Sequence, residues 1–339
     1  MNFKLIAAGI LASLPVLGAV SAHAQNINGA GATFPNPIYS KWFSEYSQQH
    51  PDVKINYQPI GSGGGIRQVS EGTVDFGATD GPMSDAQLSA SKVKVVHIPT
   101  VLGAVVPVYN LPGLNVELKF SQDALAGIYL GKITSWNDPY LQKENPGVSL
   151  PNQPILVVHR TDGSGTTYIF TDWLSKVSPE WKDKVGKGTA IGWPVGVGGK
   201  GNEGVAAMVR QAPYAIGYVE LIYAEQTKMQ FGMVRSHDGK FLKASTAGVT
   251  AAAAADLKSI PADYRVSITD ASGPDSYPIA SFTWLLIPSP AKDQAKSKAI
   301  QGFLNWMLEH GESEAAGLTY APLPKAVADR VHQTIANLK

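Results

Sequence analysis

The sequence of 339 residues contains no cysteine. No disulfide can therefore stabilise the fold, and no thiol is available to carry a lipid anchor. Only 16% of the residues are charged, and 28 lysines and arginines nearly balance 27 aspartates and glutamates. This balance excludes the basic surface that is typical of nucleic-acid-binding proteins. We expect a protein that rests on an ordinary hydrophobic core and has no nucleic-acid partner.

Long uncharged apolar runs are also absent after the N-terminus. The one such run covers residues 5–20, follows Lys4, and is succeeded by the small-residue tripeptide AHA at 22–24. This order is typical of a cleavable secretory signal peptide, and the run is shorter than the ~20 residues of a spanning helix. We therefore predict a signal peptide at 1–24, no membrane insertion after its removal and no lipid anchor. A freely diffusing exported protein is retained only where an outer membrane closes the compartment, so we expect the periplasm of a Gram-negative bacterium.

The remaining residues, about 315, suffice for two core-bearing domains. Strand and helix patterns alternate along them, which is typical of an α/β fold. The expected strands lie at 53–57, 74–78, 155–159, 215–219 and 282–287. Residues 95–109 are mostly apolar and are interpreted as one interrupted strand, and 299–309 as an amphipathic helix.

Three glycine-containing turns precede expected helix starts. They are 29–34 (GAGATF), 61–65 (GSGGG) and 162–167 (DGSGTT). The first backbone N–H groups of a helix lack partners inside the helix and lie at the positive end of its dipole, so such turns suit an oxyanion. Any one of them is more simply explained as a capped turn. Three in one chain favour an oxyanion site.

Charged residues next to these turns extend the hypothesis. Arg160 follows an expected strand directly, and its guanidinium group can bind two oxygens of an oxyanion while Asp162 holds it in place. The alternative is a surface ion pair of little energetic value. Asp80 also ends an expected strand, and taken alone it is a turn residue.

Together these motifs resemble those of the periplasmic phosphate-binding proteins of ABC-type phosphate transporters. The resemblance covers nearly all of the chain after the signal peptide, and it is specific because the motifs occur together and in order. It is carried by the segments 29–35, 61–65, 74–80, 127–133, 160–166, 193–202 and 215–220.

The resemblance implies a two-lobe periplasmic binding protein fold of type II, with a hinge and a ligand cleft between the lobes. Residues 25–102 and 278–339 would form a discontinuous lobe I, and residues 103–277 would form lobe II. It also implies a set of phosphate-binding residues, namely Thr33, Phe34 (through its N–H), Ser62, Asp80, Arg160, Ser164, Gly165 and Thr166, with Asp162 supporting Arg160. Asp80 would accept a hydrogen bond from the proton of phosphate, which sulfate lacks. Gly63 stands where close relatives often carry a second serine.

The same resemblance implies a monomer that delivers phosphate to a membrane-embedded ABC permease with its ATPase subunits, and no cofactor. Enzyme alternatives find little support in the residues. Neither Ser62 nor Ser164 has the glycine two positions earlier that a serine hydrolase elbow requires, and the seven histidines show no metal-ligand spacing. His159 is expected to pack at a strand end. A sulfate or molybdate ligand conflicts with Asp80, arsenate remains open as a ligand, and nothing supports an adhesion protein.

Overall fold

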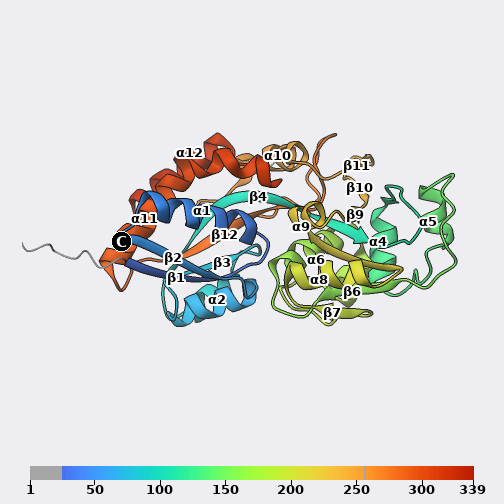
Figure 1. Ribbon diagram of the computed structural model, residues 1–339, viewed down its shortest axis with the longest axis horizontal. Coiled ribbons are helices and arrows are strands. Elements are labelled where there is room, and N and C mark those ends of the chain that lie inside the picture. The colour runs from blue at the N-terminus through green and yellow to red at the C-terminus, as the bar shows by residue number, and fades with distance from the viewer. Residues whose placement is uncertain (1–24, 256) are drawn as a thin grey trace, which may run out of the picture.

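The computed structural model describes residues 25–255 and 257–339. The predicted signal peptide at 1–24 lies outside the described residues. Figure 1 shows an elongated molecule with two α/β groups, one built from both ends of the described chain and the other from its middle. The α/β class predicted from the sequence is confirmed. Within the described ranges, no helix combines the length and the apolar character that crossing a membrane would require.

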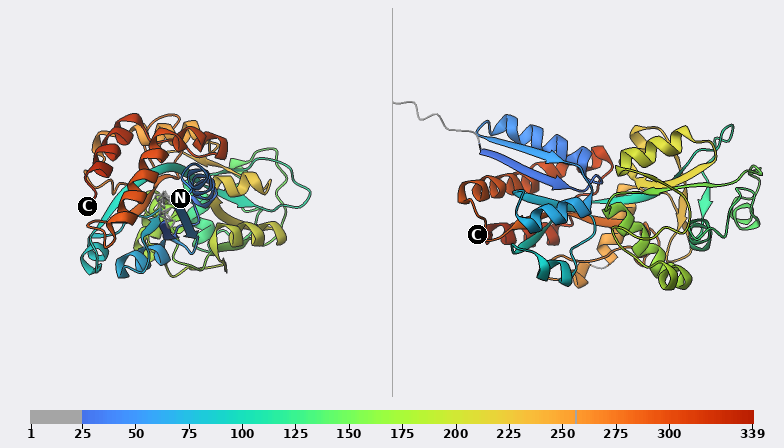
Figure 2. Two further views of the ribbon diagram at one scale, coloured as in Figure 1. Left: turned by 60° about the vertical axis from the view of Figure 1, so that its left-hand side comes forward. Right: turned by 90° about the horizontal axis from the view of Figure 1, so that it is seen from below.

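The first group combines the earliest and latest elements of the described chain. Its elements are β1 (Gln25–Gly31), α1 (Asn36–Gln49), β2 (Val53–Gln58), α2 (Ser62–Glu71), β3 (Phe76–Thr79), α3 (Asp85–Ala90), β12 (Ala280–Pro288), α11 (Gln294–Glu309), the 3-10 helix η2 (Gly311–Leu318) and α12 (Lys325–Ala336). Figure 2 shows α1 beside the C-terminal helices, and α1 contacts both α11 and η2. The Trp42 indole N–H donates to the Gly311 carbonyl oxygen at 2.9 Å, which joins the two ends of the sequence.

The second group is built from the middle of the chain. Its elements are β5 (Lys119–Phe120), α4 (Gln122–Tyr129), α5 (Pro139–Glu144), β6 (Leu156–Arg160), α6 (Gly165–Val177), α7 (Pro179–Lys184), β7 (Val197–Gly199), α8 (Gly201–Gln211), β8 (Ala215–Glu220), α9 (Leu221–Gln226), β9 (Gln230–Phe231), β10 (Met233–Arg235) and β11 (Phe241–Leu242). The chain then continues through α10 (Thr246–Ala255), which contacts β4 and β12, and the 3-10 helix η1 (Leu257–Ser259).

One long strand, β4 (Val95–Tyr109), runs through both groups. The sequence suggested an interruption there, but the structure has one continuous strand. Its residues 95–104 pair antiparallel with β12, and its residues 105–109 pair antiparallel with β8. The resulting strand order is β2-β1-β3-β12-β4-β8-β6-β7. The partner of β4 thus changes between Ala104 and Val105, at the junction of the two groups.

A second connection is the segment between η1 and β12, which contacts both groups. On one side, Arg265 Nη1 donates to the Met83 carbonyl oxygen at 2.9 Å. On the other, the hydroxyls of Ser267 and Thr269 donate to the buried Asp172 of α6 at 2.5 and 2.6 Å. This segment therefore ties the two groups together at a distance from β4.

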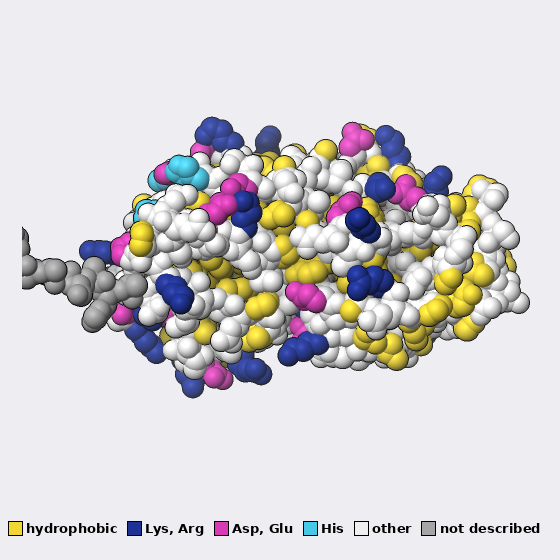
Figure 3. All heavy atoms as spheres, viewed as in Figure 1, with side chains coloured by type: hydrophobic (Ala, Val, Ile, Leu, Met, Phe, Trp, Pro, Cys, Tyr) yellow, Lys and Arg dark blue, Asp and Glu magenta, His cyan; other side chains and the backbone are white. Residues whose placement is uncertain are grey.

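The surface carries no large region of one charge on the face drawn in Figure 3. Lysine and arginine side chains are interspersed there with aspartate and glutamate side chains. This face therefore offers no extended electrostatic field of one sign.

Candidate functional site

The first glycine turn joins β1 to α1 and contains Thr33 and Phe34. Three tyrosine hydroxyls donate to its consecutive carbonyl oxygens: Tyr57 to Ala32 at 2.7 Å, Tyr223 to Thr33 at 2.5 Å and Tyr320 to Phe34 at 2.6 Å. Because the C=O and N–H of a trans peptide point in opposite directions, the bond to the Thr33 oxygen also fixes the direction of the Phe34 N–H. The turn is thus held in one orientation by tyrosines from three different segments.

Ser62 and Asp80 lie together at the next two strand ends of the same group. Ser62 is the first residue of α2, and Asp80 follows β3. The Asp80 N–H donates to Ser62 Oγ at 3.2 Å, and the Thr283 hydroxyl of β12 donates to Asp80 Oδ1 at 2.8 Å. Both Ser62 and Asp80 are buried. Asp80 is therefore a positioned buried carboxylate, not an exposed turn residue.

Arg160 is the last residue of β6 and is buried. Its Nε and Nη2 atoms donate to the two carboxylate oxygens of Asp162 at 2.8 and 2.5 Å, and its Nη1 donates to Thr166 Oγ1 at 3.3 Å. Only 1% of the Arg160 side chain and 12% of the Asp162 side chain are exposed. The surface ion pair considered from the sequence is therefore wrong: the pair is buried and its geometry is bidentate.

The N-terminus of α6 supplies Ser164, Gly165 and Thr166, all buried. Ser164 is the N-cap residue, and its Oγ accepts from the Thr167 N–H at 3.0 Å. Because this bond uses a lone pair, the Ser164 hydroxyl hydrogen remains able to donate. Gly165 and Thr166 present the first unpaired N–H groups of the 13-residue helix. This end of α6 is therefore rich in hydrogen-bond donors.

The loops of the two groups meet at these residues. A Cβ atom added at Gly165 would overlap the Asp80 carboxylate and lie 2.5 Å from Ser62 Oγ. Asn202, at the start of α8, donates from Nδ2 to Thr33 Oγ1 at 2.9 Å and to Thr166 Oγ1 at 3.1 Å. The structure thus brings the predicted site residues of both groups into one buried cluster. Asp162 lies at its edge, where its Oδ1 also accepts from the Gly201 N–H at 3.0 Å.

Burial governs the ionisation of the carboxyl groups in this cluster. It raises the pKa of Asp80 to about 7, although the Thr283 hydroxyl, the Arg160 charge and Ser62 each lower it. Burial also raises the pKa of Glu220 well above its ordinary value. The burial of Asp162 acts in the same direction, but hydrogen bonds and the charge of Arg160 hold the pKa of Asp162 below its ordinary value. The ionised Asp162 thus pairs with the charged Arg160, and Asp80 titrates near neutral pH.

Six residues of this cluster were not predicted as site residues from the sequence, namely Tyr57, Asn202, Glu220, Tyr223, Thr283 and Tyr320. Of these residues, Asn202 alone could have been identified from a local sequence pattern, because it follows the glycine-rich turn 198–201 at a helix start. The others lie inside ordinary apolar or C-terminal segments, where nothing in the sequence marks them.

The chemistry of the cluster is that of binding. It offers backbone N–H groups, hydroxyls and one guanidinium group as donors, together with the Asp80 carboxylate as an acceptor. His159 packs at the strand end as expected, with its ring stacked on Trp193 at a centroid distance of 4.9 Å. In the part of the chain that the structure describes, no group of histidine, aspartate and glutamate side chains could hold a metal ion.

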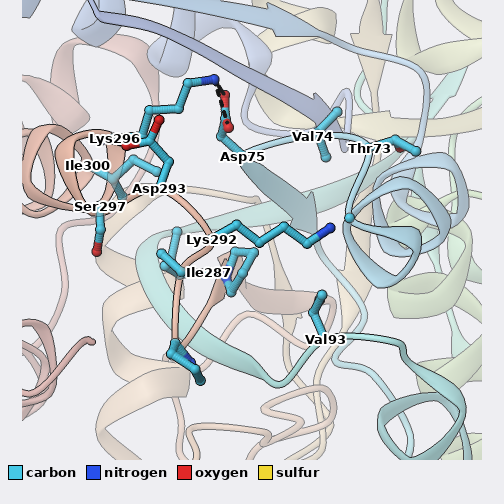
Figure 4. Close-up of a pocket in the computed structure, with 14 residues that line it drawn as sticks. Thr73, Val74, Asp75, Val93, Ile287, Lys292, Asp293, Lys296, Ser297 and Ile300 are labelled. Atoms are coloured by element: carbon cyan, nitrogen blue, oxygen red, sulfur yellow. Dashed lines mark hydrogen bonds and ion pairs between the residues drawn. The ribbon is translucent and has the colours of Figure 1, made fainter.

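A separate cavity of about 120 Å³ lies beside β3 and the start of α11. Figure 4 shows Lys296 directed at Asp75, and Lys296 Nζ lies 2.9 Å from Asp75 Oδ2. The Asn28 N–H also donates to this carboxylate, at 2.8 Å. Lys296 and Asp75 of this cavity are thus paired with each other. The buried cluster, by contrast, gathers hydrogen-bonding groups from both α/β groups, and it is the candidate site.

A family model and several curated proteins match most of this chain. Residues 18–310 match the model of the PBP superfamily domain. The phosphate-binding protein PstS of Pasteurella multocida is 44% identical over 323 residues, which is 95% of this chain and 93% of that protein. PstS of Methanocaldococcus jannaschii is 40% identical and spans 89% of this chain and 83% of its own length.

Solved structures share the fold. A high-affinity periplasmic phosphate-binding protein solved with phosphate has a TM-score of 0.71 and 22% identity, and covers 92% of this chain and 98% of its own. A phosphate-bound, putative phosphate ABC transporter substrate-binding protein from Clostridium perfringens has a TM-score of 0.65 and 19% identity, with 88% and 100% coverage. These likenesses agree with the predicted two-lobe binding protein fold.

Proposed function

Since this chain belongs to the PstS phosphate-binding proteins within the PBP superfamily, we propose that it captures inorganic phosphate for an ABC importer. The observation that carries the proposal is the contact of Ser62 and Asp80 with Gly165 of α6. It places a hydroxyl and a carboxylate of one group against the N–H groups at the start of a helix of the other. Members of this family are binding proteins, and the chain is accordingly not an enzyme.

We assign phosphate binding to Thr33, Phe34, Ser62, Asp80, Arg160, Ser164, Gly165 and Thr166, with Asp162 as the support of Arg160. The fixed Phe34 N–H and the α6 terminus supply neutral donors, and the Arg160 Nη atoms supply the charged one. A charge-assisted hydrogen bond is roughly twice as strong as a neutral one. Arg160 would therefore anchor the anion while the neutral donors set its orientation.

Asp80 would favour oxyanions that carry a proton over those that do not. An ionised carboxylate only accepts hydrogen bonds, so it accepts from a protonated phosphate oxygen and opposes a sulfate oxygen, which carries no proton. An unmade buried hydrogen bond to a charged group costs about 3 kcal/mol, or roughly a hundredfold in affinity. Arsenate carries a similar proton and remains a possible competing ligand.

We also propose that the two groups act as hinged lobes, with 25–102 and 278–339 forming lobe I and 103–277 forming lobe II. The partner change of β4 between Ala104 and Val105 supports a hinge there. Because the donors come from both groups, a ligand would favour the closed arrangement. Small-angle scattering should show compaction when phosphate is added to the ligand-free protein, and an unchanged profile would contradict the hinge.

The proposed setting is the periplasm, where a monomer released from its signal peptide would carry phosphate to a membrane-embedded permease with ATPase subunits.

The test of the function is calorimetric titration with phosphate of protein that has been unfolded and refolded to remove carried-over ligand. We expect tight one-to-one binding of phosphate and no heat from sulfate at about pH 8, where Asp80 is ionised. Absence of phosphate binding by protein with a native circular dichroism spectrum would refute the proposal.

A further inference from the structure

Asn202 is a buried amide whose hydrogen bonds are all defined. Its Oδ1 accepts from the Glu220 N–H at 2.9 Å. A backbone N–H can only donate, so this contact fixes which end of the amide is oxygen and which is nitrogen. The two hydrogens of Nδ2 then point to Thr33 Oγ1 and Thr166 Oγ1, at 2.9 and 3.1 Å.

Each of these threonine hydroxyls receives a second donor. The Asn202 N–H donates to Thr33 Oγ1 at 3.3 Å, and Arg160 Nη1 donates to Thr166 Oγ1 at 3.3 Å. A hydroxyl oxygen has two lone pairs and one hydrogen. Both lone pairs of each threonine are therefore occupied, and only its hydrogen remains for a further partner.

We propose that Asn202 is a positioning residue that turns the hydroxyl hydrogens of Thr33 and Thr166 toward the bound anion and keeps both hydroxyls from acting as acceptors. This inference rests on the proposed function, because the partner of the two hydrogens is the phosphate. Each hydroxyl hydrogen then donates to a ligand oxygen, and the acceptor that remains for the proton of phosphate is the Asp80 carboxylate. Asn202 thereby supports the proton selectivity without touching the ligand.

The arrangement also depends on closure of the site. Thr33 belongs to the first group, whereas Asn202 and Thr166 begin helices of the second. Only when the two groups meet does one amide reach both hydroxyls. Asn202 therefore couples the orientation of the donors to the closed state.

A double-mutant cycle tests the inference, because it measures whether Asn202 acts through the hydroxyls. We expect Asn202→Ala to weaken phosphate binding by about tenfold to a hundredfold in the otherwise unchanged protein. In protein that already carries Thr33→Val or Thr166→Val, Asn202→Ala should cause a loss of phosphate affinity that is at least about threefold smaller. One of the two hydroxyls that Asn202 orients is already absent from that protein. Asn202→Ser allows the same comparison if the alanine variant does not fold.

Tyr223→Phe is the matched control. Tyr223 also bridges the two groups to Thr33, but it bonds the backbone carbonyl and not the hydroxyl. Its loss should couple to Thr33→Val less strongly than Asn202→Ala does, because the bond that it removes does not involve the threonine hydroxyl. If Asn202→Ala cost the same in every background while the unchanged protein bound phosphate, the inference would be overturned. If the unchanged protein did not bind phosphate, the proposed function itself would fail.

Discussion

The Gly63 N–H donates a hydrogen bond of 2.8 Å to the carbonyl oxygen of Gly163. This bond joins the second glycine turn of one group directly to the third glycine turn of the other. Cβ atoms added at Gly63 or Gly163 would lie 3.1 or 3.0 Å from the Cα atom of the opposite glycine. The absence of side chains at both positions thus allows the two loops to come into backbone contact.

The first prediction concerns this contact. Gly163→Ala should weaken phosphate binding by about tenfold, because its methyl group meets backbone that cannot rotate away and so opposes closure. Titration calorimetry measures the loss. Gly192→Ala is the control, since a Cβ atom there would meet nothing within 4 Å. Equal affinities of the two variants would show that closure does not depend on the contact.

The second prediction uses the titration of Asp80. Its pKa of about 7 means that it is mostly ionised at about pH 8 and mostly protonated at about pH 5.5. The protonated carboxyl group can donate to an oxygen without a proton, so we expect sulfate to compete with phosphate at the lower pH and not at the higher one. Competition titrations at the two pH values measure this difference.

Asp80→Asn provides the complementary variant. Its amide can donate at either pH, so sulfate should compete with phosphate at both, and the phosphate-to-sulfate ratio should fall by about a hundredfold at the higher pH. A ratio unchanged from that of the original protein would remove Asp80 as the discriminating residue.

The parts of the site that can be predicted from the sequence are those formed by residues close to one another in the chain. A glycine turn before a helix, or Arg160 two residues before Asp162, can be interpreted from neighbouring positions. Tyr320 and Phe34 are 286 residues apart in the sequence, and Asn202 and Thr33 are 169 apart. Their hydrogen bonds exist only because the sheet and the C-terminal segment bring them together. The same limit applies to β4. Its residues 95–109 show an apolar pattern, but the pattern does not reveal that one continuous strand pairs first with β12 and then with β8.

The third prediction tests the tyrosines that hold the first turn. Tyr320→Phe removes the donor to the Phe34 carbonyl oxygen, leaves a buried acceptor unpaired and frees the turn to reorient. We expect phosphate affinity to fall by about fivefold to thirtyfold, since an unpaired buried group costs roughly 1–2 kcal/mol. Tyr264→Phe, which loses a bond to Thr334 away from the turn, should leave affinity within about twofold. Similar losses in both variants would contradict a specific role for Tyr320.

The last prediction concerns stability and a carboxyl group outside the site. Burial raises the pKa of Glu312 from 4.5 to about 8, although the Leu323 N–H donates to this carboxyl group and lowers it. In the folded protein Glu312 therefore retains a proton that the unfolded chain releases above pH 4.5. The unfolded state then binds fewer protons, so the free energy of unfolding falls as pH rises through this window.

Glu312→Gln removes this pH-dependent loss of stability, because an amide does not titrate. Its oxygen can still accept the hydrogen bond from the Leu323 N–H. We expect the variant to unfold at a higher temperature than the original protein at about pH 8, and the difference to disappear at about pH 4. Thermal unfolding followed by circular dichroism at both pH values measures the difference. Glu309→Gln, at a mostly exposed side chain of α11, should change neither value. A difference for Glu312→Gln that stayed the same at both pH values would mean that the buried carboxyl group is not the source of the pH dependence.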